Sequence, residues 1–305
     1  MSDFNELKSI VKGDVLLDVP MNEYTSMQVG GLCACMVTPH DEDDINAFID
    51  WAKRTEQRYF VIGAGTNLIV RDGGIRSPVL RMKGTFDTVE VVSEDESVLR
   101  IRAGAGTPLA RLVKYGEDNG LSGMEPLAGI PGTTGGAIVM NAGTGHGTIS
   151  DVVESVTFVE RSGKKRTLGK KNIGFGYRTC KELSSSSIVI SAVFVFRKAD
   201  KSAVSKKTAD ELKEKAQSQP LNFPSSGSIF KNPGKIKAWK LLDEAGMRGV
   251  RVRGAKYSEL HTNFIVNTGN ARAEDVLTLI DAGIEKVKEK TKVKLELEVV
   301  IIGEQ

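Results

Sequence analysis

Two glycine-rich loops limit what this chain can fold into more than any other feature. The first, Gly63-Ala64-Gly65-Thr66-Asn67, directly follows a predicted buried strand at 59–62. The second, Gly129-Ile130-Pro131-Gly132-Thr133-Thr134-Gly135-Gly136, leads into the small residues of segment 137–142. Glycine lets a backbone approach an anion closely, and successive N–H groups then bind phosphate without a charged side chain. Together the loops predict a fold that grips the two ends of one dinucleotide pyrophosphate.

Neither loop matches the best-known nucleotide motifs. Leu68 stands where a Gly-x-Gly-x-x-Gly motif needs its third glycine, and neither loop is followed by Gly-Lys-Ser/Thr. Pro131 is suited to opening a helix, whose positive end would attract an anion. Asn67 and Asn141 add amide groups for a flavin ring or a ribose. Two tight turns remain the alternative interpretation, because glycine occurs in turns of every kind.

Composition excludes several classes of protein. The 305 residues suggest about two domains, and a formal charge of +3 predicts no nucleic-acid partner. The longest mainly apolar run, 188–196, is about half the length of a membrane-spanning helix. The amino terminus lacks a signal-peptide pattern, so we expect a cytoplasmic protein without membrane insertion. Cys33, Cys35 and Cys180 are interpreted as buried free thiols, and we predict no metal site.

The order of predicted elements indicates an α+β fold. Helices are expected at 41–53 and 108–119, and the section from 85 to 198 is mainly β. A polar stretch at 198–207 is interpreted as a boundary. Further helices are predicted at 208–217, 236–245 and 273–290, the last being the most amphipathic, and the chain ends in a predicted strand at 293–302.

Three polar residues occur in unusual settings. Arg178 ends the segment Gly174-Phe175-Gly176-Tyr177-Arg178, and Ser228 lies in the serine-rich segment 224–233. In the predicted last strand, Glu298 shares a face with apolar neighbours, where a carboxylate is costly unless paired or protonated. A raised pKa there would suit an acid. Ordinary interpretations also stay open: an arginine that bridges strands, a turn serine and a glutamate at a solvated edge.

At this point the motifs resemble those of the UDP-N-acetylenolpyruvoylglucosamine reductases. The resemblance spans nearly the whole chain, and its motifs lie in family order at 24–31, 63–70, 127–143, 227–233, 263–267 and 298–303. The length resembles the shorter subtype, which lacks a tyrosine loop over the substrate. The chain departs from the family pattern at Val300, where an arginine is usual, and at Cys180 and Lys181, where a serine and an aromatic residue are common.

The resemblance implies a two-lobed FAD-binding domain of the vanillyl-alcohol-oxidase (PCMH) type plus a C-terminal α+β substrate-binding domain. Residues 1–84, joined by the C-terminal strand 293–305, would form the first lobe, residues 85–205 the second, and 206–292 the substrate domain. The implied activity is NADPH-dependent reduction of UDP-N-acetylenolpyruvoylglucosamine to UDP-N-acetylmuramate through non-covalent FAD, a step in peptidoglycan precursor synthesis. We expect a monomer.

Two alternatives are kept beside this activity. One is an FAD-dependent oxidase on the same scaffold. Many such oxidases tether flavin through histidine, whereas the three histidines, His40, His146 and His261, lie outside the first glycine loop. The other is a non-catalytic homologue that binds flavin or a nucleotide sugar.

The resemblance also assigns roles to residues. Ser228 would donate a proton, with Arg178 and Glu298 as its catalytic companions. Tyr177, Lys231 and Asn232 would bind the substrate. The residues expected to hold the cofactor are Gly63, Ala64, Gly65, Thr66, Asn67, Leu68, Ile130, Gly132, Thr133, Gly135, Gly136, Ala142, Gly143 and Ile190.

Overall fold

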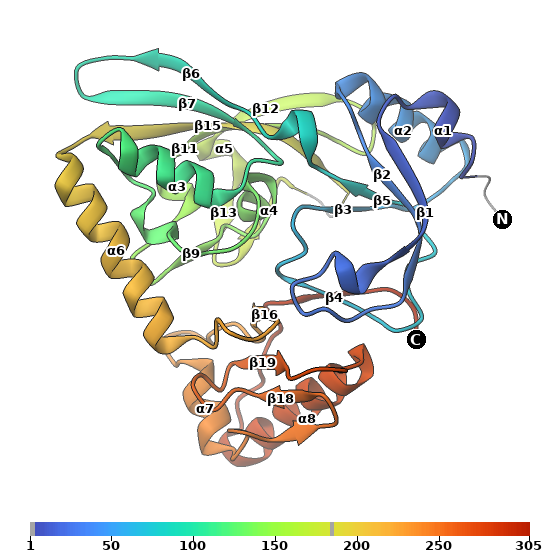
Figure 1. Cartoon of the computed structure of the whole chain (residues 1–305), viewed down its shortest axis with the longest axis vertical. Helices are drawn as coiled ribbons and strands as arrows, with labels where there is room; N and C mark the ends of the chain where they lie inside the picture. The colour runs from blue at the N-terminus through green and yellow to red at the C-terminus, as the bar shows by residue number, and fades with distance from the viewer. Residues whose placement is uncertain (1–3, 184–185) are drawn as a thin grey trace. The chain divides into compact units, whose positions relative to one another are not determined.

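The computed structural model describes residues 4–183 and 186–305. The chain divides into two compact units, each assembled from separate stretches of sequence. The first unit consists of Met1–Leu17, Cys35–Ala64 and Ser77–Glu214, and the second of Asp18–Ala34, Gly65–Arg76 and Lys215–Gln305. Both units mix helices with strands (Figure 1). The first glycine loop therefore contributes Gly63 and Ala64 to one unit and its later residues to the other.

The first unit contains a six-stranded antiparallel sheet that confirms the predicted β-rich section. Its long strands lie side by side in Figure 1, with β15 between β11 and β7. In β15 inward residues alternate with less buried ones, and Phe194 and Phe196 are completely buried. The strands are β12 (Lys165–Gly169), β11 (Val153–Val159), β15 (Ile188–Lys198), β7 (Val98–Gly104) and β6 (Val89–Glu94), with β8 (Leu121–Ser122) paired to the end of β15.

A second sheet has the order β1 (Asp14–Pro20), β2 (Leu32–Thr38), β5 (Val79–Arg81) and β3 (Phe60–Ile62), with β5 parallel to both β2 and β3. Helix α2 (Glu42–Arg54) confirms the helix predicted at 41–53. The Asp41 side chain caps α2 by accepting from the Asp44 N–H at 3.0 Å. Acidic residues in its first turn and basic residues in its last match the helix dipole.

Short elements of the first unit flank the second glycine loop and form the hairpin that contains Arg178. The helix after the loop, α4 (Thr134–Val139), begins at Thr134 and not at Pro131. Its first amides, those of Thr134 and Gly135, donate to the carbonyls of Thr107 and Ala105. The expectation that a helix opens at Pro131 is therefore wrong, whereas the binding of an anion by this loop stays a prediction. The other short elements are α1 (Leu7–Ile10), η2 (Gly84–Phe86), α3 (Leu109–Asp118), η3 (Glu125–Leu127), β9 (Gly143–Thr144), β10 (Gly147–Thr148), η4 (Ile149–Asp151), α5 (Lys170–Ile173), β13 (Phe175–Gly176) and β14 (Thr179–Cys180).

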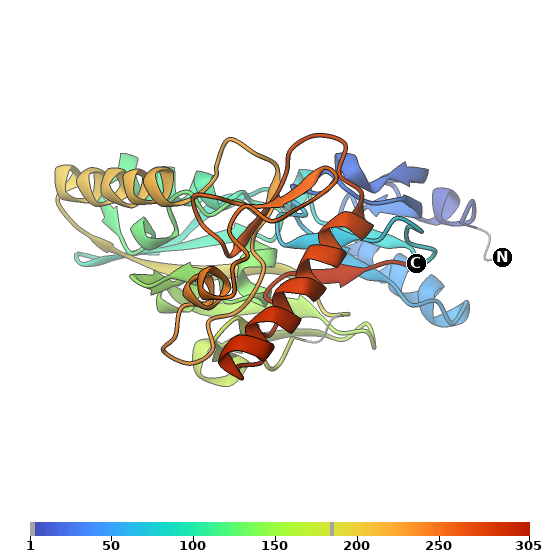
Figure 2. The ribbon, with the colours of Figure 1, turned by 90° about the horizontal axis from the view of Figure 1, so that it is seen from below.

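In the second unit, one helix packs on a small antiparallel sheet and a second helix packs against the first. The sheet has the order β16 (Ser225–Ser228), β19 (Phe264–Asn267), β18 (Ala255–Tyr257) and β17 (Arg251–Val252). Helix α8 (Ala273–Thr291) runs along this sheet, as Figure 2 shows, and buries the face predicted from its spacing. Asp72 accepts from the Ala273 and Glu274 N–H groups at the start of α8, at 3.1 and 3.0 Å. The remaining elements are η1 (Met21–Glu23), β4 (Leu68–Val70), α7 (Ala238–Glu244) and β20 (Val300–Ile302), which pairs in parallel with β4.

Two predicted elements have different limits in the structure. The polar stretch at 198–207 is not a linker, because helix α6 (Lys201–Ser218) begins inside it. Its lysine and alanine residues are good helix formers, so polarity there marks an exposed helix. The predicted strand 293–302 is reduced to β20, and Glu298 lies in a bend before it. The expectation that Glu298 shares a strand face with Val300 and Ile302 is therefore wrong.

Cys33, Cys35 and Cys180 are buried and free of disulfides, as predicted. Within residues 4–183 and 186–305, every helix is too short or too polar to cross a bilayer.

Candidate active site

Ser228 ends a strand that contains a bulge. Ser225 lies opposite Val266 and Ser228 opposite Phe264, so β16 has one residue more than its partner over this interval. Gly227 lies within the irregularity at φ +74°, a backbone conformation that glycine adopts without steric cost. Bulges of this kind change the direction of side chains. The half-buried Ser228 therefore owes its orientation to Gly227.

Glu298 is fixed against the same strand. Its N–H donates to the carbonyl of Ile229, the residue after Ser228, at 2.8 Å. The Asn67 side-chain amide donates to the Glu298 carbonyl at 3.0 Å, and the Val300 N–H donates to the Asn67 carbonyl at 2.9 Å. The structure thus brings together the Ser228 strand, Glu298 and the end of the first glycine loop.

The same loop has a second attachment to the Ser228 strand. Ser226 is buried, and its hydroxyl donates to the Leu68 carbonyl at 3.0 Å. On the preceding side, the Ser26 N–H donates to the carbonyl of Gly65, whose φ is +66°. The loop is therefore held through its backbone carbonyls. Those of three predicted cofactor residues accept hydrogen bonds: Gly65, Asn67 and Leu68.

Lys231 and Asn232 lie in the irregular segment that follows β16. The Lys231 N–H donates to the Glu296 carbonyl at 2.8 Å, and its Nζ lies 3.9 Å from Glu296 Oε2. Asn232 Oδ1 accepts from the Ala238 N–H at 2.9 Å, so this side chain also begins α7. Lys231 places a positive charge three residues after Ser228.

In the first unit, Arg178 lies in the two-residue loop that joins β13 to β14. Its φ is +53°, which costs an L-residue about 1–2 kcal/mol. The guanidinium Nη2 donates to the Gly143 carbonyl at 2.9 Å, and its Cζ lies 5.3 Å from the centre of the Tyr177 ring. Tyr177 is 53% exposed. A strained, charged residue over an exposed ring is a combination that occurs at ligand sites.

The second glycine loop passes close to the beginning of the first. A Cβ at Gly63 would lie 2.2 Å from Thr133 Oγ1, so the backbone there can approach Thr133 only as glycine. Thr133 is only 9% exposed, and its hydroxyl is without a hydrogen-bond partner in the part of the chain that the structure describes. Buried hydroxyls normally have partners. These residues fit a polar ligand that approaches through glycine backbone.

The other predicted cofactor residues of this unit surround that loop. The Ile190 carbonyl accepts from the Ala105 N–H at 2.8 Å, and the Ala105 carbonyl in turn accepts from Gly135. Ala142 donates to the Ala137 carbonyl, which holds the end of α4 beside the loop. Gly143 is buried, Gly132 has φ +128°, and Ile130 and Gly136 retain solvent exposure.

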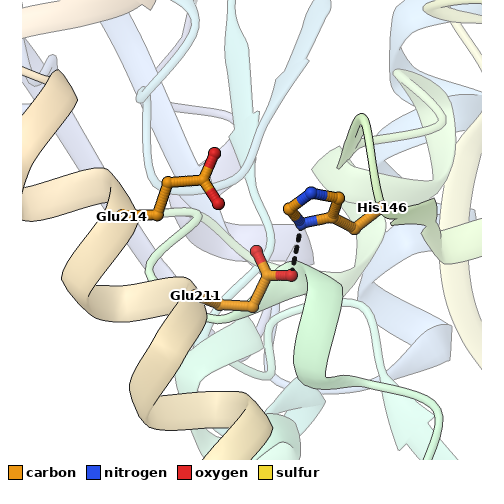
Figure 3. A group of neighbouring side chains, drawn as sticks. All are labelled: His146, Glu211 and Glu214. Atoms are coloured by element: carbon orange, nitrogen blue, oxygen red, sulfur yellow. Dashed lines mark hydrogen bonds and ion pairs between the residues drawn. The ribbon is translucent and has the colours of Figure 1, made fainter.

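A separate cluster contains the side chains most suited to a metal. His146, Glu211 and Glu214 turn their ligand atoms toward one another, with all three atoms within 4.8 Å (Figure 3). His146 Nδ1 and Glu211 Oε1 are 2.6 Å apart, which is a hydrogen bond that already uses two of these atoms. This hydrogen bond accounts for the proximity of His146 and Glu211, and the absence of a metal stays a prediction.

Comparisons with known proteins match both parts of this structure. Residues 33–169 match the FAD binding domain model, and residues 219–302 match the model described as the UDP-N-acetylenolpyruvoylglucosamine reductase C-terminal domain. The UDP-N-acetylenolpyruvoylglucosamine reductase of Geobacter metallireducens is 40% identical over 99% of this chain and 98% of its own length. The chain belongs to the UDP-N-acetylenolpyruvoylglucosamine reductase family.

A second curated relative and a solved structure agree with this assignment. The reductase of Clostridium novyi is 37% identical over 99% of this chain and 97% of its own. The crystal structure of UDP-N-acetylenolpyruvylglucosamine reductase from Thermus caldophilus has a TM-score of 0.80 and 34% identity, covering 95% of this chain and 98% of its own. The predicted family, the fold class and an FAD-dependent oxidoreductase are thereby confirmed.

The reductase also contains residues that motif reading did not assign. Asn263 is 4% exposed; its Oδ1 accepts from the Phe230 N–H, and its Nδ2 donates to the Phe230 carbonyl. It supports the Ser228 strand where β16 ends. The sequence gives only a partial signal: Asn263 and Asn267 enclose the apolar run Phe264-Ile265-Val266, and buried amides need partners, but the run does not indicate Phe230 as the partner.

Proposed function

We propose that this protein reduces UDP-N-acetylenolpyruvoylglucosamine to UDP-N-acetylmuramate with NADPH, in the synthesis of peptidoglycan precursors. The observation that carries the proposal is the hydrogen-bonded connection between Ile229, Glu298 and Asn67. It joins the residue after Ser228, a candidate proton donor, to the backbone of Glu298 and to a glycine loop, in a chain 40% identical to a reductase of this name. We further propose that the protein acts as a cytoplasmic monomer, with the lobes at 1–84 and 85–205 and the substrate domain at 206–292.

The cofactor would be held by the two glycine loops. The Thr133 hydroxyl suits a phosphate or the ring of FAD, because it is buried without a hydrogen-bond partner among the described residues, and the glycine backbone of the loops offers N–H groups without side chains in the way. Bound FAD would supply the hydride transfer from NADPH to the enolpyruvyl double bond.

The chain's own residues then stabilise the negative charge that develops and supply a proton. Hydride addition at C3 of the enolpyruvyl group builds negative charge at C2 and on the carboxylate. Arg178 and Lys231 stabilise that charge, which is greatest in the transition state. Ser228 donates its hydroxyl proton to C2. A free serine is a weak acid, so the alkoxide needs stabilisation from neighbours such as Lys231, and such acid catalysis is typically worth about 10²–10⁴-fold.

The test separates the two half-reactions. In Ser228→Ala, NADPH should bleach the flavin at the wild-type rate, whereas the enolpyruvyl sugar should reoxidise it about 10²–10⁴-fold more slowly. Ser225→Ala is the matched control, since Ser225 lies on the same strand, and it should keep both rates. Equal slowing of both half-reactions in Ser228→Ala would refute the role given to Ser228.

The same experiment distinguishes the oxidase alternative. A reductase should retain its reduced flavin under nitrogen until the enolpyruvyl sugar is added. Rapid reoxidation by oxygen, with no response to the sugar, would favour an oxidase. A flavin that NADPH never bleaches would favour a binding homologue.

A further inference from the structure

The backbone conformation of the loop that contains Arg178 is energetically unfavourable and requires stabilising contacts. Arg178 has φ +53°, and only two residues, Tyr177 and Arg178, join β13 to β14. The hairpin itself is short, with Phe175 opposite Cys180 and Gly176 opposite Thr179. A two-strand hairpin of this length is not stable alone in water. Contacts outside the hairpin must therefore hold the guanidinium in place.

Asn141 supplies one of these contacts. Its Nδ2 donates to the Gly176 carbonyl, immediately before the loop, at 2.8 Å. Arg178 Nη2 donates to the Gly143 carbonyl, two residues after Asn141, at 2.9 Å. Two reciprocal hydrogen bonds thus join the hairpin to residues 141–143.

Asn141 is itself firmly placed. It is 6% exposed, its N–H donates to the Ile138 carbonyl in α4, and its Oδ1 accepts from the Ser150 N–H at 3.3 Å. Its φ of +42° is tolerated by asparagine better than by most residues. Flanking bonds tie Ala142 to Ala137 and to Ile149. The sequence suggested that this amide would meet a flavin or a ribose, but at least one of its donors is used inside the protein.

We propose that Asn141 is a positioning residue for Arg178. Its amide fixes the hairpin through Gly176, so that the guanidinium is presented in one orientation to the carboxylate of the substrate. This inference deepens the proposed function and rests on it for the role of Arg178. Asn141 touches neither the substrate nor the reacting atoms in this scheme.

The decisive variant is Asn141→Asp, which keeps the shape and the acceptor but replaces the donor to Gly176 with a carboxylate oxygen. We expect flavin bleaching by NADPH to be unchanged. The sugar-dependent step should slow by about 10–100-fold, because even a small displacement of a substrate-positioning group lowers the rate strongly. Asn119→Asp is the control. Asn119 Nδ2 also donates to a backbone carbonyl, that of Tyr115, at 2.8 Å, but on an exposed helix end.

A double-mutant cycle separates positioning from general stability. If Asn141 acts only through Arg178, then Asn141→Asp should have no further effect on the sugar-dependent step in an Arg178→Ala background. Additive losses in the double variant would overturn the proposal. Should Asn141→Asp fail to fold, Asn141→Gly removes the amide while keeping the left-handed backbone accessible.

A second readout works without turnover. Hydrogen exchange at the hairpin amides of Thr179 and Cys180 should be at least about tenfold faster in Asn141→Asp than in Asn119→Asp. Unchanged exchange would refute the positioning role even if the enzyme were slowed. If the wild type shows no activity with the enolpyruvyl sugar, the proposed function fails, while the exchange result still decides whether Asn141 holds the hairpin.

Discussion

The side-chain amide of Asn67 donates to the backbone carbonyl of Glu298 at 3.0 Å, which connects a glycine loop near the amino terminus to the carboxyl-terminal segment. The reverse contact, from the Val300 N–H to the Asn67 carbonyl, makes the connection reciprocal. A residue expected to hold the cofactor therefore also fixes a residue expected to take part in proton transfer.

Asn67→Ala should separate these two roles. The substitution removes the donor to Glu298, and the loss of one such hydrogen bond costs about 0.5–1.5 kcal/mol. We expect a slower sugar-dependent step that persists at saturating FAD, because Glu298 loses one of its backbone hydrogen bonds whether or not the cofactor is bound. Rapid-mixing measurements of flavin reoxidation across a range of FAD concentrations would check this. Asn222→Ala, at an exposed position of the same unit, provides the comparison. Complete recovery at high FAD would restrict Asn67 to cofactor binding.

Asn263→Ala tests how strongly the Ser228 strand depends on a buried amide. Phe230 is 1% exposed, and its N–H and carbonyl bond to the Asn263 side chain at 3.0 and 2.8 Å. Alanine would leave both backbone groups unpaired, so we expect the free energy of unfolding to fall by about 2–4 kcal/mol. Urea unfolding followed by circular dichroism measures it. Asn119→Ala should cost less than about 1 kcal/mol, because its single bond is exposed. Similar losses of unfolding free energy in both variants would contradict the supporting role given to Asn263.

Local sequence patterns predicted the elements in which the spacing of apolar side chains determines the buried face. Helix α8 followed from the spacing of five apolar residues on one face. Four of them, Val276, Leu279, Ile280 and Val287, are buried, and Ile284 is partly buried. The extent of the last strand did not follow, because alternation cannot anticipate that the Ile229 carbonyl accepts from both Glu298 and Val299.

In the candidate site, too, some features could be predicted from the sequence and others could not. The glycine loops and Ser228 were found as motifs, because their residue types are unusual in that order. The supports given by Asn67, Asn141 and Asn263 could not be found in this way, since each depends on a backbone carbonyl far away in sequence. A motif names the side chains that face a ligand, whereas the bonds that hold them arise only in the folded chain.

A half-buried histidine gives the second unit a defined response to acid. His261 packs edge-on against Phe264, with ring centres 5.0 Å apart, and lies 6.2 Å from the ring of Trp239. Its Nδ1 is buried and has no hydrogen-bond partner among residues 4–183 and 186–305. Burial lowers the pKa of His261 below its usual value of 6.5; Arg248 lowers it further, while Asp243 opposes the shift.

The sign of the effect follows from proton binding. The unfolded chain takes up a proton at this residue as the pH falls through 6.5, whereas the folded chain resists it, so acid favours unfolding. Above that pH the residue is neutral in both states and its contribution is constant. We expect His261→Gln to lose less stability than the wild type between about pH 7.5 and 5, measured by urea unfolding at each pH. His40→Gln, which removes an exposed histidine, should retain the wild-type acid sensitivity. If His261→Gln loses as much stability as the wild type over this range, His261 is protonated in the folded protein without cost, and its burial does not govern the response.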